Sequence, residues 1–193
     1  QEMEKIDKDK LWEYYMPNDP ADEETVKESF SKLGVNIPNE LIELYQVLNG
    51  WDCFFQMVDL FSLSDYFSDK MNYAKTILHT ILEYQEEFGI NDLLPIAVSR
   101  DDIDVFVLVV GGKSFGQVIW FAGGIIERFD SIWSFLTEML NLSKATILRW
   151  RRKIVILDNT EEYDYVCDAD TLIKRADLKL YQGKENGRDQ IVY

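Results

Sequence analysis

The chain has 193 residues, and 47% of them are hydrophobic, which is enough apolar material to fill the core of one domain. This composition excludes a disordered chain. The formal net charge is −15. A chain this acidic repels phosphate backbones, which argues against a nucleic-acid-binding function.

The charge is unevenly distributed along the chain. All of the net negative charge lies in residues 1–148, whereas residues 149–193 hold nine acidic and nine basic residues. The change coincides with a basic run over residues 149–153, and no linker rich in Gly, Pro or Ser marks it. We therefore predict an acidic domain over residues 1–148. A C-terminal appendage over residues 149–193 is expected to dock on this domain, its basic residues pairing with carboxylates.

We expect neither a targeting signal nor a membrane span. Residues 1–10 alternate acidic residues with lysines and lack the apolar run of a signal peptide. The longest apolar run covers residues 105–110, far fewer than the about 20 residues that a membrane helix needs. The two cysteines, Cys53 and Cys167, are too few for a disulfide scaffold and suit a reducing compartment. These features predict a cytoplasmic protein.

Three helices are predicted in the first half of the chain. Apolar residues recur at helical spacing over residues 25–33. A second helix begins at Pro38, a residue favoured in the first turn, and Gly50 supplies its left-handed stop. A longer helix is predicted over residues 64–88, where an apolar stripe again follows the helical period.

From residue 93 the apolar spacing changes from helical to extended. Four consecutive strands are predicted, over residues 93–98, 103–110, 117–121 and 125–129. Their short turns, rich in Gly and Asp, imply antiparallel neighbours. A helix capped by Asp130 or Ser131 follows. The sequence therefore predicts an α+β fold, in which an antiparallel meander of about four strands has helices packed at one face.

The appendage is predicted as a small strand-helix-strand unit. Residues 153–157 form its first strand, and residues 169–181 form a helix. A short strand over residues 190–193 follows the Asn186-Gly187 turn.

Several motifs occur together in a recognisable order. They are the Val-Asn-Ile-Pro-Asn-Glu-Leu run over residues 35–41, Tyr45, the Asn49-Gly50 pair, the Leu-Pro-Ile-Ala run over residues 94–97, the acidic turn over residues 101–104 and the Phe-Asp-Ser-Ile-Trp-Ser-Phe-Leu run over residues 129–136. In order and spacing, from about residue 23 to residue 142, the chain resembles the SUKH superfamily. That superfamily is named partly after a fungal regulator of cell-wall assembly and glucan synthesis.

This resemblance implies an α+β binding domain with no catalytic residues to transfer. Many bacterial members of the superfamily are immunity proteins that neutralise toxins delivered to neighbouring cells, often nucleases, and fungal members are linked to glucan synthesis. The chain departs from the family pattern at residues 99–102, Ser-Arg-Asp-Asp, where relatives often have a Gly-rich acidic turn. The segment beyond Ser143 is not explained by the family.

No constellation of residues predicts catalysis. His79 is the only histidine, and it lies inside the long predicted helix without the partners of a triad or a metal site. Asp101, Asp102 and Asp104 are interpreted first as a solvated strand end, with an interaction surface and a metal site as alternatives. We therefore expect no enzyme activity, no cofactor and no metal.

The binding residues that we predict are Trp51, Asp52, Asp101, Asp102 and Asp104, which combine an aromatic side chain with carboxylates. The expected function is an immunity protein whose acidic surface meets a basic toxin domain, without nucleic-acid or membrane partners. The alternative is a regulator of cell-wall or glucan synthesis that acts through protein contacts. The sequence does not indicate an oligomeric state.

Overall fold

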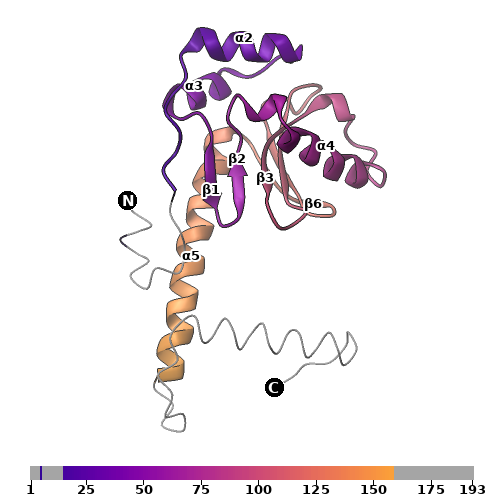
Figure 1. Ribbon diagram of the computed structural model, residues 1–193. Coiled ribbons are helices and arrows are strands. Elements are labelled where there is room, and N and C mark those ends of the chain that lie inside the picture. The colour runs from indigo at the N-terminus through magenta and orange to yellow at the C-terminus, as the bar shows by residue number, and fades with distance from the viewer. Residues whose placement is uncertain (1–4, 6–14, 159–193) are drawn as a thin grey trace. The chain divides into compact units, whose positions relative to one another are not determined.

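The computed structural model describes residue 5 and residues 15–158 of the chain. Glu13–Ser143 forms one compact unit, and residues 1–12 and 144–193 form a second one. The first unit contains the whole sheet, helices α2 to α4 and the first part of α5 (Figure 1).

Two short helices open the fold. Helix α2 (Glu23–Leu33) begins after Asp22, whose side chain accepts a hydrogen bond from the Thr25 backbone nitrogen at 2.8 Å. It ends at Gly34, which adopts the left-handed conformation with a φ of 67°. Helix α3 (Asn39–Val47) follows directly. Both helices lie where the apolar spacing predicts them, but α3 ends at the extended Leu48 and not at a left-handed Gly50.

The centre of the fold is one antiparallel sheet of six strands. The strands are β1 (Trp51–Phe55), β2 (Val58–Leu60), β3 (Leu93–Ser99), β4 (Val105–Val109), β5 (Val118–Phe121) and β6 (Ile125–Phe129). Each strand pairs with its neighbour in sequence, so the sheet is a meander with β1 and β6 at its edges. The connections β1–β2, β3–β4 and β5–β6 turn at the same end of the sheet, the lower end in Figure 1. The predicted α+β class is confirmed, and β1 and β2 are additional to the four predicted strands.

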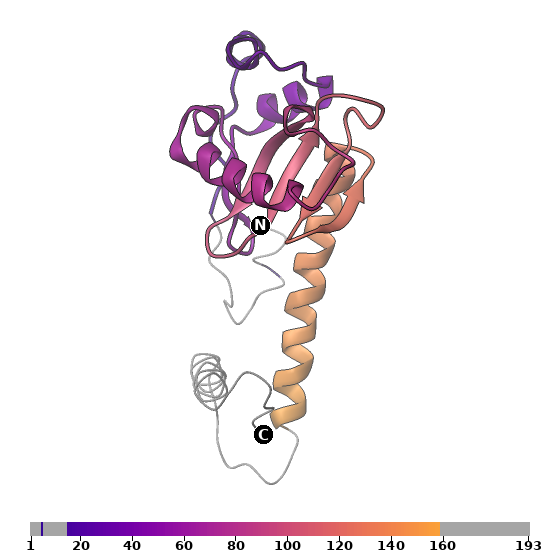
Figure 2. The same cartoon turned by 90° about the vertical axis from the view of Figure 1, so that its right-hand side faces the viewer.

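Helices cover both faces of this sheet, whereas the sequence pattern placed them at one face. Helix α4 (Asp69–Leu82) packs against β3 and β4, and the first turns of helix α5 (Ile132–Asp158) lie on the opposite face (Figure 2). The burial of β3 and β4 requires this second layer, because every residue of both strands is buried. Strands buried on both faces read as continuous apolar runs without alternation, as residues 105–110 do.

Phe135 anchors α5 to the sheet through aromatic contacts. Its ring centroid lies 5.1 Å from that of Phe106, 5.5 Å from that of Phe129 and 5.8 Å from that of Phe54. These separations are those of favourable aromatic pairs. The first turns of α5 are thereby fixed against β1, β4 and β6.

The helix predicted over residues 64–88 is shorter in the structure. A turn of 3-10 helix (Asp65–Phe67) comes first, and α4 begins only at Asp69. Ser68 separates the two because its backbone is extended and its side chain accepts a hydrogen bond from the Lys70 backbone nitrogen. A second 3-10 turn (Ile90–Asp92) leads into β3.

The strand predicted over residues 153–157 is wrong, because these residues continue helix α5. Their β-branched side chains favour a strand, and the continuing helix overrides this weak preference. The helix predicted over residues 169–181 and the strand over residues 190–193 lie outside the described residues. The division at residue 148 and the docking of the appendage stay predictions.

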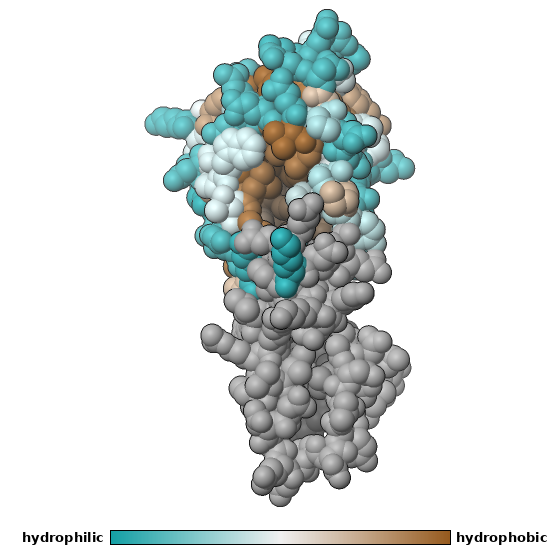
Figure 3. Space-filling model, turned by 90° about the vertical axis from the view of Figure 1, so that its left-hand side faces the viewer, coloured by the Kyte–Doolittle hydropathy of each residue, from teal (hydrophilic) through white to brown (hydrophobic). Residues whose placement is uncertain are grey.

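The surface of the unit is polar around α2. Figure 3 shows hydrophilic side chains over α2 at the top of one face, with a strip of apolar side chains below them. Among the described residues, no helix combines the length and the apolar character needed to cross a membrane.

Candidate functional site

A buried carboxylate lies within the sheet. Asp59 sits on β2 between Val58 and Leu60 and is only 3% exposed. The Arg100 Nε lies 2.9 Å from its Oδ1 and 2.8 Å from its Oδ2, and the Cys53 backbone nitrogen donates to Oδ1 at 2.9 Å. A buried charge requires such partners, since leaving it unpaired costs far more than a neutral polar group.

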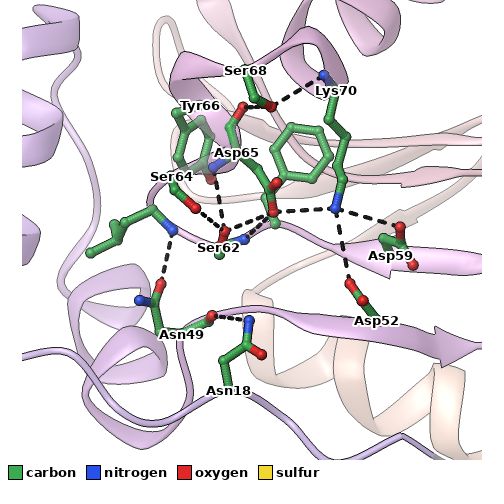
Figure 4. Close-up of polar contacts among 12 residues, drawn as sticks. Asn18, Asn49, Asp52, Asp59, Ser62, Ser64, Asp65, Tyr66, Ser68 and Lys70 are labelled. Carbon is green, nitrogen blue, oxygen red and sulfur yellow. Dashed lines mark hydrogen bonds and ion pairs between the residues drawn. The ribbon is translucent and has the colours of Figure 1, made fainter.

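Helix α4 brings a second cation to the same carboxylate. The Lys70 Nζ lies 3.4 Å from Asp59 Oδ2, 3.3 Å from Asp65 Oδ2 and 4.0 Å from Asp52 Oδ1 (Figure 4). Ser68 fixes the first turn of α4, so the lysine projects from a defined position. The ion pairs therefore join α4 to β1 and β2.

We call Asp52, Asp59, Asp65, Lys70 and Arg100 the carboxylate network. Arg100 also reaches Asp52, with Nη2 at 3.3 Å from Oδ2, and its hydrogen bonds to Asp59 raise the pKa of the guanidinium further above its usual value. The network holds one more carboxylate than cation, and Asp52 is its most exposed carboxylate. Lys70 and Arg100 hold these carboxylates in fixed positions. The network therefore gives this part of the domain a charged surface of defined geometry.

Polar contacts fix the loop between β2 and α4. The Asp65 carboxylate accepts hydrogen bonds from the Ser62 backbone nitrogen at 2.7 Å and from its hydroxyl at 2.8 Å (Figure 4). Asn49 accepts from the Leu63 backbone nitrogen at 2.8 Å, and the Asn18 side chain donates to the Asn49 carbonyl at 2.9 Å. The Asn49-Gly50 motif thus connects the end of α3 to this loop.

Two buried tyrosines, Tyr45 and Tyr66, stabilise the loop between β2 and α4. The Tyr45 hydroxyl donates to the Phe61 carbonyl at 2.9 Å and lies 3.1 Å from the Tyr66 hydroxyl. Burial raises the pKa of both tyrosines, because the charged form would lose its hydration. Tyr45, one of the motif residues, therefore has a structural role here.

Three of the residues predicted to bind have partners within the protein. Asp52 belongs to the carboxylate network. The half-buried Trp51 lies at the start of β1, and its Nε1 donates to the Tyr15 carbonyl at 2.7 Å. The half-buried Asp104 accepts a hydrogen bond from the Trp120 Nε1 at 2.6 Å.

Asp101 and Asp102 lie exposed in the β3–β4 loop. Both backbone nitrogens point to the Ser99 hydroxyl oxygen, at 3.4 and 3.2 Å. In the part of the chain that the structure describes, neither carboxylate forms an ion pair, and no three His, Cys, Asp or Glu side chains are grouped to hold a metal ion. Arg100 links this loop to Asp52, which directly follows Trp51 at the start of β1.

A model of the SMI1 / KNR4 family (SUKH-1) matches residues 20–138 of the chain. The chain belongs to this family. The resemblance that the motifs predict is thereby confirmed, and the match ends within α5. A comparison with curated proteins finds no match. Membership of the SUKH-1 family supports a non-enzymatic regulatory or immunity domain that acts through protein contacts.

Sequence reasoning missed most of the network of this SUKH domain. Asp59 is a lone carboxylate within an apolar run, and this pattern could have predicted a buried ion pair. Arg100 lies in the turn that departs from the family pattern, and its residue type alone does not predict a partner. Lys70 carries no local signal, because only the packing of α4 brings it to Asp59.

Proposed function

We propose that this SUKH domain is an immunity protein that neutralises a bacterial toxin by binding it. Its partner is a basic domain of nuclease type. The observation that carries the proposal is the charge, since residues 1–148 of a SUKH-1 chain hold the whole net charge of −15. A domain that acts on nucleic acid presents Lys and Arg to the phosphates, so an acidic surface is complementary to it.

The charge is available for an external partner. Glu28, Glu86, Asp101 and Asp102 are exposed, and none of them forms an ion pair within the described residues. These carboxylates are spread over α2, the segment after α4 and the β3–β4 loop. Complementary charge raises the association rate and selects partners more than it adds affinity. The proposal includes a cytoplasmic location, which suits a chain with two cysteines.

Affinity capture on the immobilised full chain, followed by mass spectrometry, tests this proposal. We expect native lysate to yield a basic toxin domain. Its association rate should fall about tenfold or more as salt rises from about 0.01 M to 1 M, because the screening length falls from about 30 Å to about 3 Å. Dissociation should change far less, since apolar contacts are not screened.

Two results would count against the proposal. Recovery of cell-wall or glucan-synthesis enzymes, without a toxin domain, would favour the regulatory alternative. An association rate indifferent to salt would show that charge does not guide the encounter.

A further inference from the structure

Three apolar side chains are exposed near the end of the sheet where the hairpins turn. Met57 lies in the β1–β2 turn, Ile103 in the β3–β4 loop and Tyr73 on α4. Each is between 44% and 50% exposed. A single exposed apolar side chain is ordinary, whereas several that share one surface are typical of a protein-binding site.

Contacts between the loops bring these side chains onto one surface. The Met57 carbonyl accepts a hydrogen bond from the Arg100 backbone nitrogen at 2.9 Å, and the Tyr73 hydroxyl lies 3.5 Å from the Asp102 carbonyl. The Ile103 Cδ1 would lie 3.6 Å from a Cβ placed on Gly123, in the β5–β6 turn. We call Met57, Tyr73, Asp101, Asp102 and Ile103 the hairpin-end surface.

The carboxylates of this surface define the chemistry of its partner. Asp101 and Asp102 are exposed, and their neighbour Arg100 is already committed to Asp59 and Asp52. Two uncompensated negative charges therefore lie beside the apolar side chains. Interfaces commonly combine apolar anchors with a polar rim, and this rim is complementary to Lys and Arg.

The loop that carries the charges is held in shape before any partner binds. The Ser99 hydroxyl accepts from two backbone nitrogens of the loop, and the Asp102 Oδ1 accepts from the Ile103 backbone nitrogen at 2.8 Å. A preformed surface loses less conformational entropy on binding. The loop is thus suited to recognising one partner geometry.

We propose that the hairpin-end surface is the docking site for a basic protein domain. The partner's apolar side chains cover Met57, Tyr73 and Ile103, and its Lys and Arg side chains pair with Asp101 and Asp102. This inference rests on the proposed function for the identity of the partner, and it adds the surface that the partner occupies.

Hydroxyl-radical footprinting of the full chain, free and in complex with the captured domain, tests the docking site. Methionine and tyrosine side chains both react with hydroxyl radicals when exposed. We expect the oxidation rates of Met57 and Tyr73 to fall about fivefold or more in the complex, because docking would bury side chains that are now half exposed. Met16 and Tyr84, 76% and 84% exposed, are the matched controls and should keep their rates.

Variants separate the two contributions to docking. The double variant Asp101→Asn/Asp102→Asn should lower the association rate about fivefold, and Ile103→Ser should raise the dissociation rate about tenfold. As controls, Glu28→Gln/Glu86→Gln should lower the association rate less than the Asp101/Asp102 pair does, and Val47→Ser, at an exposed residue of α3, should leave dissociation nearly unchanged. All these variants should keep the unfolding midpoint of the parent chain.

The outcomes distinguish the docking site from the proposed function. Unchanged oxidation of Met57 and Tyr73 in a complex with a basic toxin would overturn the docking site alone. Protection of both in the free, dilute chain would also overturn it, because another part of this chain would then cover the surface. Protection by a partner that is basic but not a toxin would support the docking site and contradict the immunity function.

Discussion

Replacing Gly50 by alanine is expected to lower the free energy of unfolding by about 3 kcal/mol or more. Gly50 has a φ of 85°, which an L side chain adopts only with strain. A Cβ at this position would also lie 2.6 Å from the Ser62 backbone nitrogen and 2.7 Å from its Cα. The loop between β2 and α4 would have to shift, and its hydrogen bonds to Asn49 and Asp65 would weaken.

Gly112 provides the matched control. Its φ is 71°, yet no heavy atom lies within 4 Å of the place where a Cβ would stand. Gly112→Ala should therefore cost only the backbone strain, about 1 kcal/mol. Urea unfolding followed by tryptophan fluorescence measures both variants. Equal losses would show that the close approach of Gly50 to Ser62 does not constrain the fold.

Replacing Arg100 by methionine is expected to lower the free energy of unfolding by about 3 kcal/mol. The substitution keeps an apolar stem but leaves the buried Asp59 carboxylate with Lys70 as its remaining cation, at 3.4 Å. Removing one partner of a buried ion pair is costly because the other charge stays in a poorly solvated place. Urea unfolding at neutral pH gives the magnitude.

Arg128→Met is the control for this prediction. Arg128 makes a bidentate pair with Glu87, at 2.6 and 2.7 Å, and both side chains are substantially exposed. Exposed pairs contribute less than about 1 kcal/mol, so this variant should have little effect. In the double variant Asp59→Asn/Arg100→Met, part of the loss should be recovered, since the uncompensated charge is gone. Similar losses for Arg100→Met and Arg128→Met would contradict a structural role for the carboxylate network.

Local sequence patterns predicted most of the sheet. Strands β3 to β6 are marked by extended apolar runs and by turns rich in Gly and Asp. Strand β2 has only three residues, and its pairing with β1 is irregular. Cys53 and Gln56 have positive φ values of 48° and 52°. Cys and Gln are not residue types that favour this conformation, so the sequence does not predict it.

The candidate site was less accessible to sequence reasoning, because ion pairs join residues far apart in the chain. Asp59 and Arg100 are 41 residues apart and meet only because β2 pairs with β3. Asp101 and Asp102 stand out as a cluster of carboxylates, and the structure leaves both exposed. The sequence does not indicate that Met57 and Tyr73 are exposed, because their exposure depends on how the hairpins and α4 pack.

A growth assay of toxin neutralisation tests the immunity function most directly. The captured basic domain is expressed in bacteria from an inducible promoter, with or without the full chain. We expect the domain alone to stop growth and the full chain to restore it. The Asp101→Asn/Asp102→Asn/Ile103→Ser variant should restore growth much less well. Growth arrest that persists in the presence of the correctly folded full chain would contradict the immunity function.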